Sequence, residues 1–381
     1  MKKILFLFPH FLLPGGAANS TVLFARGLNE KGYLTEIICA GASENFLQEN
    51  KDLKFTILKI PNSGTFVYWA FFPFWQFKIN KKLSQYPDYV FFPQVLPSNW
   101  WAWIFKLTHK YQKIIWNCNE PSAFIHSKTW IKAIKNPIMR IGATTLNPIL
   151  KKMDIFLEKQ SNFVFCNSRH SAADYEKSYH KKSMAIIYPP SYVKKLPPSE
   201  KKQDYIFTVS RLSKFKNVNL LIEAFSKINK KIPNYSLLIA GDGEEKESLE
   251  KLAKENNLQS KIKLLGKVSD EKRSELYSNA RVTVLCSKNE PFGLVPIESM
   301  MHGTPVIAHK SGGPLETIID GKTGFLYENE SDLTACLEKI INLNNEQYAE
   351  MQKASQVQAK EFDISKSVAR LEETLSEVLK K

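Results

Sequence analysis

Short apolar runs alternate with amphipathic stretches along the whole chain. Apolar runs bounded by turn residues are typical of buried parallel strands. A segment with apolar residues at helical spacing, which ends before Gly32, predicts the first crossover helix at residues 18–31. In the first half we predict strands at residues 4–8, 34–39, 89–92, 113–118 and 163–167.

The same pattern restarts in the second half of the chain. Here we predict strands at residues 205–210, 236–240, 261–265, 282–286 and 305–308. Amphipathic stretches between them predict helices at residues 218–231, 244–256, 270–280 and 297–302. Repeated strand–helix units of this kind predict two doubly wound parallel sheets.

A proline- and lysine-rich segment, Tyr188–Gln203, separates the two halves and is predicted to be the linker. We therefore expect one α/β domain at 1–195 and another at 196–364. Periodicity leaves open which domain the final helix, residues 365–381, packs against. Since ligands bind at the carboxyl ends of such strands, we expect a site in a cleft between two facing domains.

The first residues, MKKILFLFPHFLLPGGAA, resemble a signal peptide in their lysines and apolar run. Pro9 and His10 interrupt that run, and the downstream pattern needs a first strand here. We therefore favour a buried strand that leads into Gly15 and Gly16. No run of about 20 apolar residues is present, so the sequence predicts no spanning helix.

Charge is distributed very unevenly over the 381 residues, whose net charge is +15. Residues 1–196 hold 26 Lys+Arg and 11 Asp+Glu, whereas residues 197–381 hold 27 of each. All seven Trp also lie in the first part. The two domains are therefore expected to have different partners. The five Cys form no C-x-x-C pair, which favours isolated core thiols in a reducing compartment.

The segment EPFGLVPIESMMHGTPVIAHKSGGPLE, residues 290–316, carries the strongest chemical signal. Glu290 and Glu298 are eight residues apart, so their carboxylates could accept hydrogen bonds from sugar or ribose hydroxyls. The amides of Gly293, Leu294 and Val295 lie near a predicted helix start, which suits a phosphate. The alternative is a pair of glutamates that only favour the helix dipole.

Two cations follow the strand at 205–210, in the segment VSRLSKFKN. Arg211 and Lys216 could neutralise a diphosphate, Arg as a bidentate donor and Lys as a point charge. Taken alone, the segment is more typical of a solvated basic loop, and only a position opposite the amides of Gly293–Val295 would give the two cations a specific role.

Two further loops follow predicted strands of the first half. Gly15 and Gly16 do not form G-x-G-x-x-G, so the sequence does not support a dinucleotide-binding fingerprint. The backbone amides of the two glycines could still bind a phosphate. The alternative is a plain tight turn. In the segment 114–126, Asn119 could hydrogen-bond a sugar hydroxyl and Glu120 could bind the acceptor or brace the loop. His126 has no metal-spaced partner, and we expect it at the surface.

These motifs together resemble the retaining nucleotide-sugar glycosyltransferases of family 4, which have the GT-B fold. The resemblance is most specific over 205–330, where the Arg/Lys loop, the Gly241–Gly243 turn, L-G-x-V, E-x7-E and D-G-x-T-G-F-L follow in order. It implies two Rossmann-like domains facing across a cleft and a final helix that crosses back to the first domain.

The resemblance also implies roles for individual residues. Arg211 and Lys216 would stabilise the donor diphosphate, Glu298 would hold the ribose, and Glu290 with Gly293–Val295 would hold the donor sugar and phosphate. Gly15, Gly16, Gly241 and Gly266 would lie at the donor, and no metal would be needed. Many family members have His where this chain has Asn119. A mechanism that uses a protonated His at this position is therefore in doubt for this chain.

The implied activity is transfer of a hexose from a GDP- or UDP-sugar to a saccharide or lipid-linked acceptor, with retention. It would serve cell-surface polysaccharide or glycolipid synthesis in the cytoplasm. The Tyr188–Pro190 segment is similar to that of mannosyl-type members. One alternative is a GT-B enzyme of another reaction type, an epimerase or a phosphorylase. Another is a basic nucleic-acid-binding protein, but this leaves the neutral second half of the chain unexplained. We therefore expect no nucleic-acid partner.

Aromatic residues and lysines lie close together in the first half. Residues 66–77 and 100–105, with Lys78, Lys81, Lys82 and Lys106 nearby, predict contact with an anionic membrane surface or a lipid-linked saccharide. The alternative is that the aromatics are core residues and the lysines only solvated.

Overall fold

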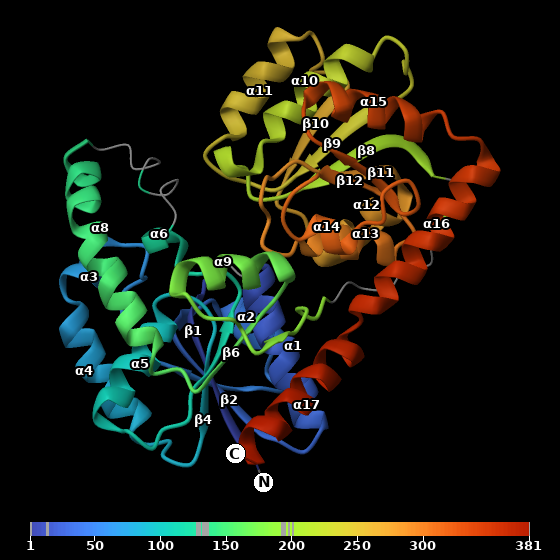
Figure 1. The fold of residues 1–381 in the computed structure, drawn as a ribbon. Helices are drawn as coiled ribbons and strands as arrows, with labels where there is room; N and C mark the ends of the chain where they lie inside the picture. The colour runs from blue at the N-terminus through green and yellow to red at the C-terminus, as the bar shows by residue number, and fades with distance from the viewer. Residues whose placement is uncertain are drawn as a thin grey trace. The chain divides into compact units, whose positions relative to one another are not determined.

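The structure is a computed structural model that describes residues 2–12, 15–126, 131, 137–191, 196, 199 and 202–380. The chain divides into two compact units (Figure 1). The first comprises residues 1–190 and 364–381, and the second comprises residues 191–363. Half of the predicted linker, at 192–195, 197–198 and 200–201, lies outside the described residues.

Two parallel sheets form the centre of the first unit. The larger has the order β3-β2-β1-β4, and the smaller has the order β5-β6-β7. The strands are β1 (Lys3–Phe11), β2 (Leu34–Ala42), β3 (Lys54–Ile57), β4 (Val90–Pro93), β5 (Ile115–Cys118), β6 (Phe163–Cys166) and β7 (Ala185–Ile186). The five predicted strands are confirmed. The periodicity missed β3 and β7, which are too short for alternation or an apolar run to identify them.

Helices surround these sheets. Those before residue 190 are α1 (Gly16–Glu30), α2 (Glu44–Glu49), α3 (Phe66–Ala70), α4 (Phe72–Leu83), α5 (Ser98–Thr108), α6 (Ala123–His126), α8 (Pro137–Glu158) and α9 (Arg169–Tyr179). Helix α5 is central to the aromatic core, because its Trp100, Trp101 and Trp103 are at most 2% exposed. The expectation that residues 100–105 contact a membrane is therefore wrong for these tryptophans, which instead pack inside the unit.

The final helix, α17 (Ile364–Lys380), packs against α1 within the first unit. Val368, Leu371 and Leu375 are buried in the same cluster as Phe24 and Leu28 of α1. The contact is so close that a methyl group added at Gly27 would lie 2.4 Å from a methyl carbon of Val368. Close helix packing therefore attaches the end of the chain to the unit in which it begins.

The second unit contains one parallel sheet with the order β10-β9-β8-β11-β12-β13. Its strands are β8 (Gln203–Val209), β9 (Ser236–Ala240), β10 (Ile262–Gly266), β11 (Ala280–Leu285), β12 (Val306–His309) and β13 (Gly324–Tyr327). All five predicted strands are present, and β13 is an additional edge strand. Its helices are α10 (Val218–Ile228), α11 (Lys246–Glu255), α12 (Asp270–Asn279), α13 (Leu294–Met301), α14 (Pro314–Thr317), α15 (Glu330–Ile341) and α16 (Asn345–Ala359), with the 3-10 turns η1 (Lys214–Lys216) and η2 (Lys360–Phe362).

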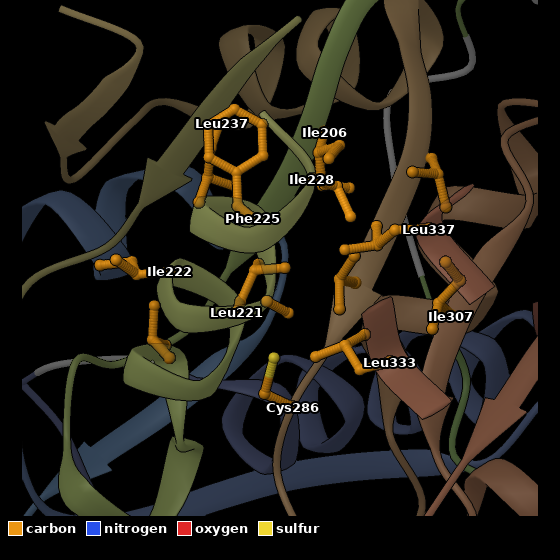
Figure 2. Close-up of a cluster of buried hydrophobic side chains, with 14 of the residues drawn as sticks. Ile206, Leu221, Ile222, Phe225, Ile228, Leu237, Cys286, Ile307, Leu333 and Leu337 are labelled. Atoms are coloured by element: carbon orange, nitrogen blue, oxygen red, sulfur yellow. The ribbon is translucent and has the colours of Figure 1, made fainter. Parts of the chain in front are cut away.

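Helices α10 and α15 bury their apolar faces on one side of this sheet (Figure 2). Leu221 and Phe225 of α10 and Leu337 of α15 are fully buried together with Ile206 and Ile307 of the sheet. Each such side chain stabilises the fold by roughly 1.5–3 kcal/mol. This rigid layer fixes the strand ends from which the loops described below emerge.

Lys202, directly before β8, is expected to make a pH-dependent contribution to stability. Its Nζ donates to the Ser278 carbonyl at 2.6 Å and to Thr304 Oγ1 at 2.8 Å. Burial lowers the pKa of Lys202 to about 7. Between about pH 7 and pH 10.5, the unfolded chain therefore binds a proton at this residue that the folded chain does not, so its contribution to stability increases as the pH rises. We expect the difference in unfolding free energy between wild type and Lys202→Met to increase from pH 7 to pH 10 in urea titrations; an unchanged difference would contradict this.

Candidate donor-binding site

The two central strands of the second sheet mark a point where its order reverses. Strand β8 pairs with β9 on one side and with β11 on the other, so successive connections run in opposite directions from this place. In open α/β sheets, ligands bind outside the carboxyl ends of the strands at such a point. The loops that follow β8 and β11 are residues 210–217 and 286–293, and these contain the cations and the first glutamate of the sequence motifs.

Lys216 and Glu290 join these two loops. Lys216 Nζ lies 2.8 Å and 3.0 Å from the two carboxylate oxygens of Glu290. Ser287 Oγ also donates to Glu290. The Lys216 side chain is 28% exposed and the Glu290 side chain is 19% exposed, so the pair is partly shielded yet reachable from solvent. An ammonium has three donors, and an incoming diphosphate could share or displace Glu290 as its partner.

Arg211 lies on the same loop as Lys216 but has a different partner. Its guanidinium is 3.7 Å from Glu244, and its side chain is 75% exposed. A contact of this kind between exposed side chains contributes little to stability. The structure therefore brings together Lys216 and Glu290, while the Arg211 side chain extends into solvent where it can reorient toward a ligand.

Helix α13 begins directly after the loop of Glu290. Gly293 is its N-cap, with φ +85°, and no side chain caps the helix there. A positive φ of this size is accessible at low cost only to glycine. Leu294 and Val295 form the first turn, whose amides have no partner within the helix. This helix start is therefore suited to a phosphate, because its amides and dipole both favour an anion.

The loop of Glu290 is held in place by two glycines that the sequence reasoning did not assign to the site. A Cβ added at Gly312 would lie 2.4 Å from the Glu290 carbonyl oxygen, and one at Gly313 would lie 2.0 Å from that of Phe292. The amide of Gly313 donates to the Glu290 carbonyl at 2.8 Å. Only glycines allow the two backbones to approach this closely. The S-G-G sequence after β12 is the signal that could have identified them.

Glu298, on the second turn of α13, lies in a separate hydrogen-bonded group. Tyr277 of α12 donates its hydroxyl to Glu298 Oε2 at 3.0 Å, and Arg273 Nε lies 3.4 Å from the same oxygen. Burial raises the pKa of Tyr277 above its ordinary value, so it remains a donor. The Glu298 side chain is 14% exposed. Tyr277 and Arg273 therefore hold this carboxylate in position; the sequence pattern did not identify either.

The other predicted glycines of this unit differ in their surroundings. A Cβ at Gly241 would lie 1.8 Å from the carbonyl oxygen of Ser210, so Gly241 lets the turn after β9 pack against the loop of Arg211. Gly266, at the end of β10, has open space around the corresponding position. Of the two, only Gly241 has a packing reason to be glycine.

Among the described residues, no group of three or more His, Cys, Asp or Glu side chains is arranged to hold a metal ion.

In the first unit, Gly15 and Gly16 are exposed at the start of α1. Gly15 is the N-cap with extended backbone, and no side chain caps this helix. A Cβ at Gly15 would meet no atom within 4 Å. The helix start is thus sterically accessible to a ligand, whereas the residues before it, Leu13 and Pro14, lie outside the described part of the chain.

Amide side chains gather where β4, β5 and β6 of the first unit end. Asn117 Nδ2 donates to Gln94 Oε1 at 2.7 Å, and Asn167 Nδ2 donates to Asn119 Oδ1 at 3.3 Å. Asn119 Nδ2, Asn117 Oδ1 and Asn167 Oδ1 are buried without a protein hydrogen-bond partner. Such groups need water or a ligand to satisfy them. Glu120, the next residue after Asn119, is exposed.

The expectation that His126 lies at the surface is wrong. Its side chain is 6% exposed, and Nε2 lies 2.8 Å from Asp154 Oδ2 on α8. Asp154 is fully buried and also accepts hydrogen bonds from Trp100 and Tyr179, each at 2.6 Å. The histidine therefore belongs to a buried polar network that attaches α6 to α8. This network depends on residues far apart in the sequence, so local spacing could not predict it.

Comparisons with known proteins agree with this architecture. Residues 193–361 match the family described as "Glycosyl transferases group 1". The chain is 23% identical over 376 residues to an uncharacterized glycosyltransferase of Haemophilus influenzae, covering 97% of this chain and 98% of that one. It is 25% identical over 268 residues to the human alpha-1,3/1,6-mannosyltransferase ALG2, covering 62% of this chain and 61% of that protein. The chain spans only about half, 49%, of the fission yeast alg2 mannosyltransferase, to which it is 24% identical.

Solved structures resemble the chain over nearly its whole length. HepE of Anabaena, in complex with UDP and glucose, has a TM-score of 0.78 at 19% identity, covering 99% of this chain and 100% of that one. Sucrose-phosphate synthase from Thermosynechococcus elongatus has a TM-score of 0.81 at 17% identity, covering 100% and 99%. With the two Rossmann-like units, these structures show that the chain has the GT-B fold, and the match to the group 1 glycosyltransferases lies in its second unit, over residues 193–361.

Proposed function

We propose that this enzyme transfers a hexose from a GDP- or UDP-sugar to a saccharide or lipid-linked saccharide acceptor, with retention of the anomeric configuration. The observation that carries the proposal is the Lys216–Glu290 pair beside the uncapped start of α13, at the reversal point of the second sheet. A cation and a row of amides converge there, as a diphosphate requires.

The chemistry follows from where charge develops. When the bond between the anomeric carbon and the phosphate oxygen breaks, its electron pair stays on the phosphate, and positive charge grows on the sugar. Lys216, Arg211 and the amides of Leu294 and Val295 would stabilise the leaving diphosphate, so the countercharge comes from the chain rather than from a metal ion. In a retaining reaction, the acceptor oxygen bonds to the same face of the sugar and gives its proton to the departing phosphate.

Other residues would orient the substrates. In this proposal Glu298 accepts hydrogen bonds from the ribose hydroxyls, Glu290 contacts the donor sugar, and Gly15 and Gly16 contact the donor from the first unit. Asn119, with its buried and unpartnered Nδ2, would donate to a sugar hydroxyl, and Glu120 would contact the acceptor. Amides bind hydroxyls without needing a charge, which fits a neutral saccharide.

Names of relatives support the substrate class. ALG2 is a mannosyltransferase, and HepE was solved with UDP and glucose.

We propose a cytoplasmic role in cell-surface polysaccharide or glycolipid synthesis, supported by five cysteines that are all free thiols. No helix of the described residues is long and apolar enough to cross a membrane.

The proposal is tested by finding the donor first and then its reaction. Thermal-shift measurements with UDP, GDP and their sugars should raise the melting temperature for one nucleotide series, because ligand binding stabilises the native state. A radiolabelled donor from that series should then give a glycosylated acceptor whose NMR coupling shows the donor's anomeric configuration. Formation of only an epimer or a sugar phosphate would contradict transfer, and an inverted anomer would contradict retention.

Replacement of Glu298 by Gln should weaken donor binding more than it slows chemistry. The change removes a charged acceptor for ribose hydroxyls, which is worth about 1.5–3 kcal/mol, so we expect KM for the donor to rise by about 10- to 100-fold with a smaller change in kcat. The exposed Glu275→Gln on α12 is the matched control and should leave KM unchanged. A fall in kcat with unaltered KM would contradict ribose binding by Glu298.

A further inference from the structure

Large apolar side chains are exposed along α4 of the first unit. Phe71, Phe74 and Phe77 are spaced three residues apart and are 59%, 61% and 72% exposed. Residues three apart on a helix lie on one side of it. Lys78 and Lys81 are exposed beside them. A stripe of three exposed phenylalanines is costly in water unless something covers it.

A second apolar stripe runs along α8. Its members, between 38% and 64% exposed, are Ile141, Leu146, Ile149, Met153 and Phe156. At about 100° per residue they fall within roughly 140° of the helix circumference. The inward side carries the buried Asp154 and Leu157 instead. Helix α8 is therefore apolar on its outward side as well as on the side that packs inward, whereas the outward side of an ordinary surface helix is polar.

Helices α3, α4 and α8 lie on one side of the first unit, over α5 (Figure 1). Trp100 of α5 contacts Trp69 and Phe72 through its ring, and its Nε1 donates to Asp154 of α8. The two stripes are thus carried by helices anchored to the same buried tryptophan. We call the exposed apolar residues of α4 and α8 together the α4–α8 face.

Charge in this region is mostly positive. Residues 53–158 hold 14 Lys or Arg and four acidic residues, and two of these four, Asp154 and Glu158, are buried. Lys151 and Lys152 are exposed on α8 itself. Most of the net charge of the chain therefore comes from the segment that carries the apolar stripes. A second copy of this chain would bring like charges together, whereas an anionic lipid surface would complement both properties.

We propose that the α4–α8 face binds an anionic lipid bilayer, with both helices lying in the interface plane. The phenylalanines and the aliphatic residues of α8 would enter the boundary between headgroups and acyl chains, while Lys78, Lys81, Lys151 and Lys152 contact the lipid phosphates. This contact is independent of glycosyl transfer, and it would place the first unit next to a lipid-linked acceptor.

Vesicle flotation of the full chain tests the proposal, with phosphatidylcholine vesicles and with vesicles that also contain phosphatidylglycerol. Wild type should float with the anionic vesicles and much less with the neutral ones. The triple variant Phe71→Ser, Phe74→Ser, Phe77→Ser should lower partitioning by about a hundredfold or more, and Ile149→Ser with Phe156→Ser should do likewise. Replacing Lys78, Lys81, Lys151 and Lys152 by Gln should lower it by about fivefold per lysine, and added salt should have the same effect.

Matched controls come from the second unit. Leu315→Ser with Val357→Ser removes side chains that are 53% and 57% exposed, and Lys251→Gln with Lys254→Gln removes exposed charge; both should leave flotation unchanged. Since every altered residue is exposed, circular dichroism should show folded variants. The proposal would be overturned if wild type failed to float, or if the variants of the α4–α8 face floated as well as wild type. It would also be overturned if light scattering showed a dimer that only those variants abolish. Donor hydrolysis, measured separately, distinguishes this failure from failure of the proposed reaction.

Discussion

Replacement of Lys216 by Ala should lower turnover by about 10²–10³-fold while the protein remains folded. The ammonium lies beside Glu290 at the reversal point of the second sheet, where a leaving diphosphate would gain negative charge. Loss of such a preorganised donor typically raises the barrier by about 3–4 kcal/mol. Because the pair is partly exposed, we expect only a small change in melting temperature. Steady-state rates with the identified donor and a thermal melt measure both.

Lys214→Ala is the matched control for this variant. Lys214 lies in the same 3-10 turn, two residues before Lys216, and is exposed to solvent. Its removal changes the charge of the loop equally but should leave turnover within about twofold, since surface substitutions of this kind have small effects. Equal losses in the two variants would show that general loop charge, rather than the position of Lys216, is responsible. Normal turnover of Lys216→Ala would remove the residue from the site.

Replacement of Gly312 by Ala should impair both stability and catalysis. Gly312 has φ +69°, and the added Cβ would lie 2.4 Å from the Glu290 carbonyl oxygen and 2.7 Å from its amide nitrogen. The left-handed conformation alone costs about 1–2 kcal/mol for alanine. To relieve the contact, the loop that carries Glu290 must move, and we expect a further 1–3 kcal/mol of destabilisation, a typical cost for overpacking. Urea unfolding gives the stability, and the same assay gives turnover.

Gly321→Ala isolates the contribution of the contact. Gly321 has φ +76°, close to that of Gly312, but an added Cβ would meet no atom within 4 Å. This control should therefore show the conformational cost without loss of turnover. If Gly312→Ala and Gly321→Ala were equally stable and equally active, the close approach to Glu290 would have no functional consequence.

The strand pattern could be predicted because each central strand is buried on both sides. Apolar runs such as those at Tyr205 and Val282 leave few other interpretations, and β8 and β11 lie where they were expected. Strand β13 was missed, since Gly324–Tyr327 is four residues long and lies at the sheet edge. Sheet order, and with it the reversal point between β8 and β11, depends on tertiary pairing that local periodicity does not contain.

The positions of the two glutamates in the fold were predictable, but their hydrogen-bond partners were not. The spacing of Glu290 and Glu298 placed one after a strand and the other on a helix, as the structure shows. That Glu290 pairs with Lys216, and Glu298 with Tyr277, depends on contacts between residues 74 and 21 positions apart. No spacing rule gives such contacts. Gly312 is a similar case, because its need for glycine arises from a loop more than 20 residues earlier.

Helix α8 shows why an apolar pattern alone can mislead. Apolar residues at helical spacing normally predict the buried side of a helix. Here Asp154 is buried beside Leu157, because Trp100, His126 and Tyr179 satisfy its carboxylate, while the apolar Ile149 is exposed. Tertiary hydrogen bonds therefore contribute, together with the packing of Leu157, to the orientation of the helix. The same contacts turn outward the stripe that we propose meets a lipid surface.

A structure of the chain with bound UDP or GDP tests the central claim most directly. We predict diphosphate oxygens within about 3.2 Å of Lys216 Nζ and of the first amides of α13, and a ribose hydroxyl at a similar distance from Glu298. A nucleotide bound elsewhere, with the Lys216–Glu290 pair remote from both phosphates, would contradict the account.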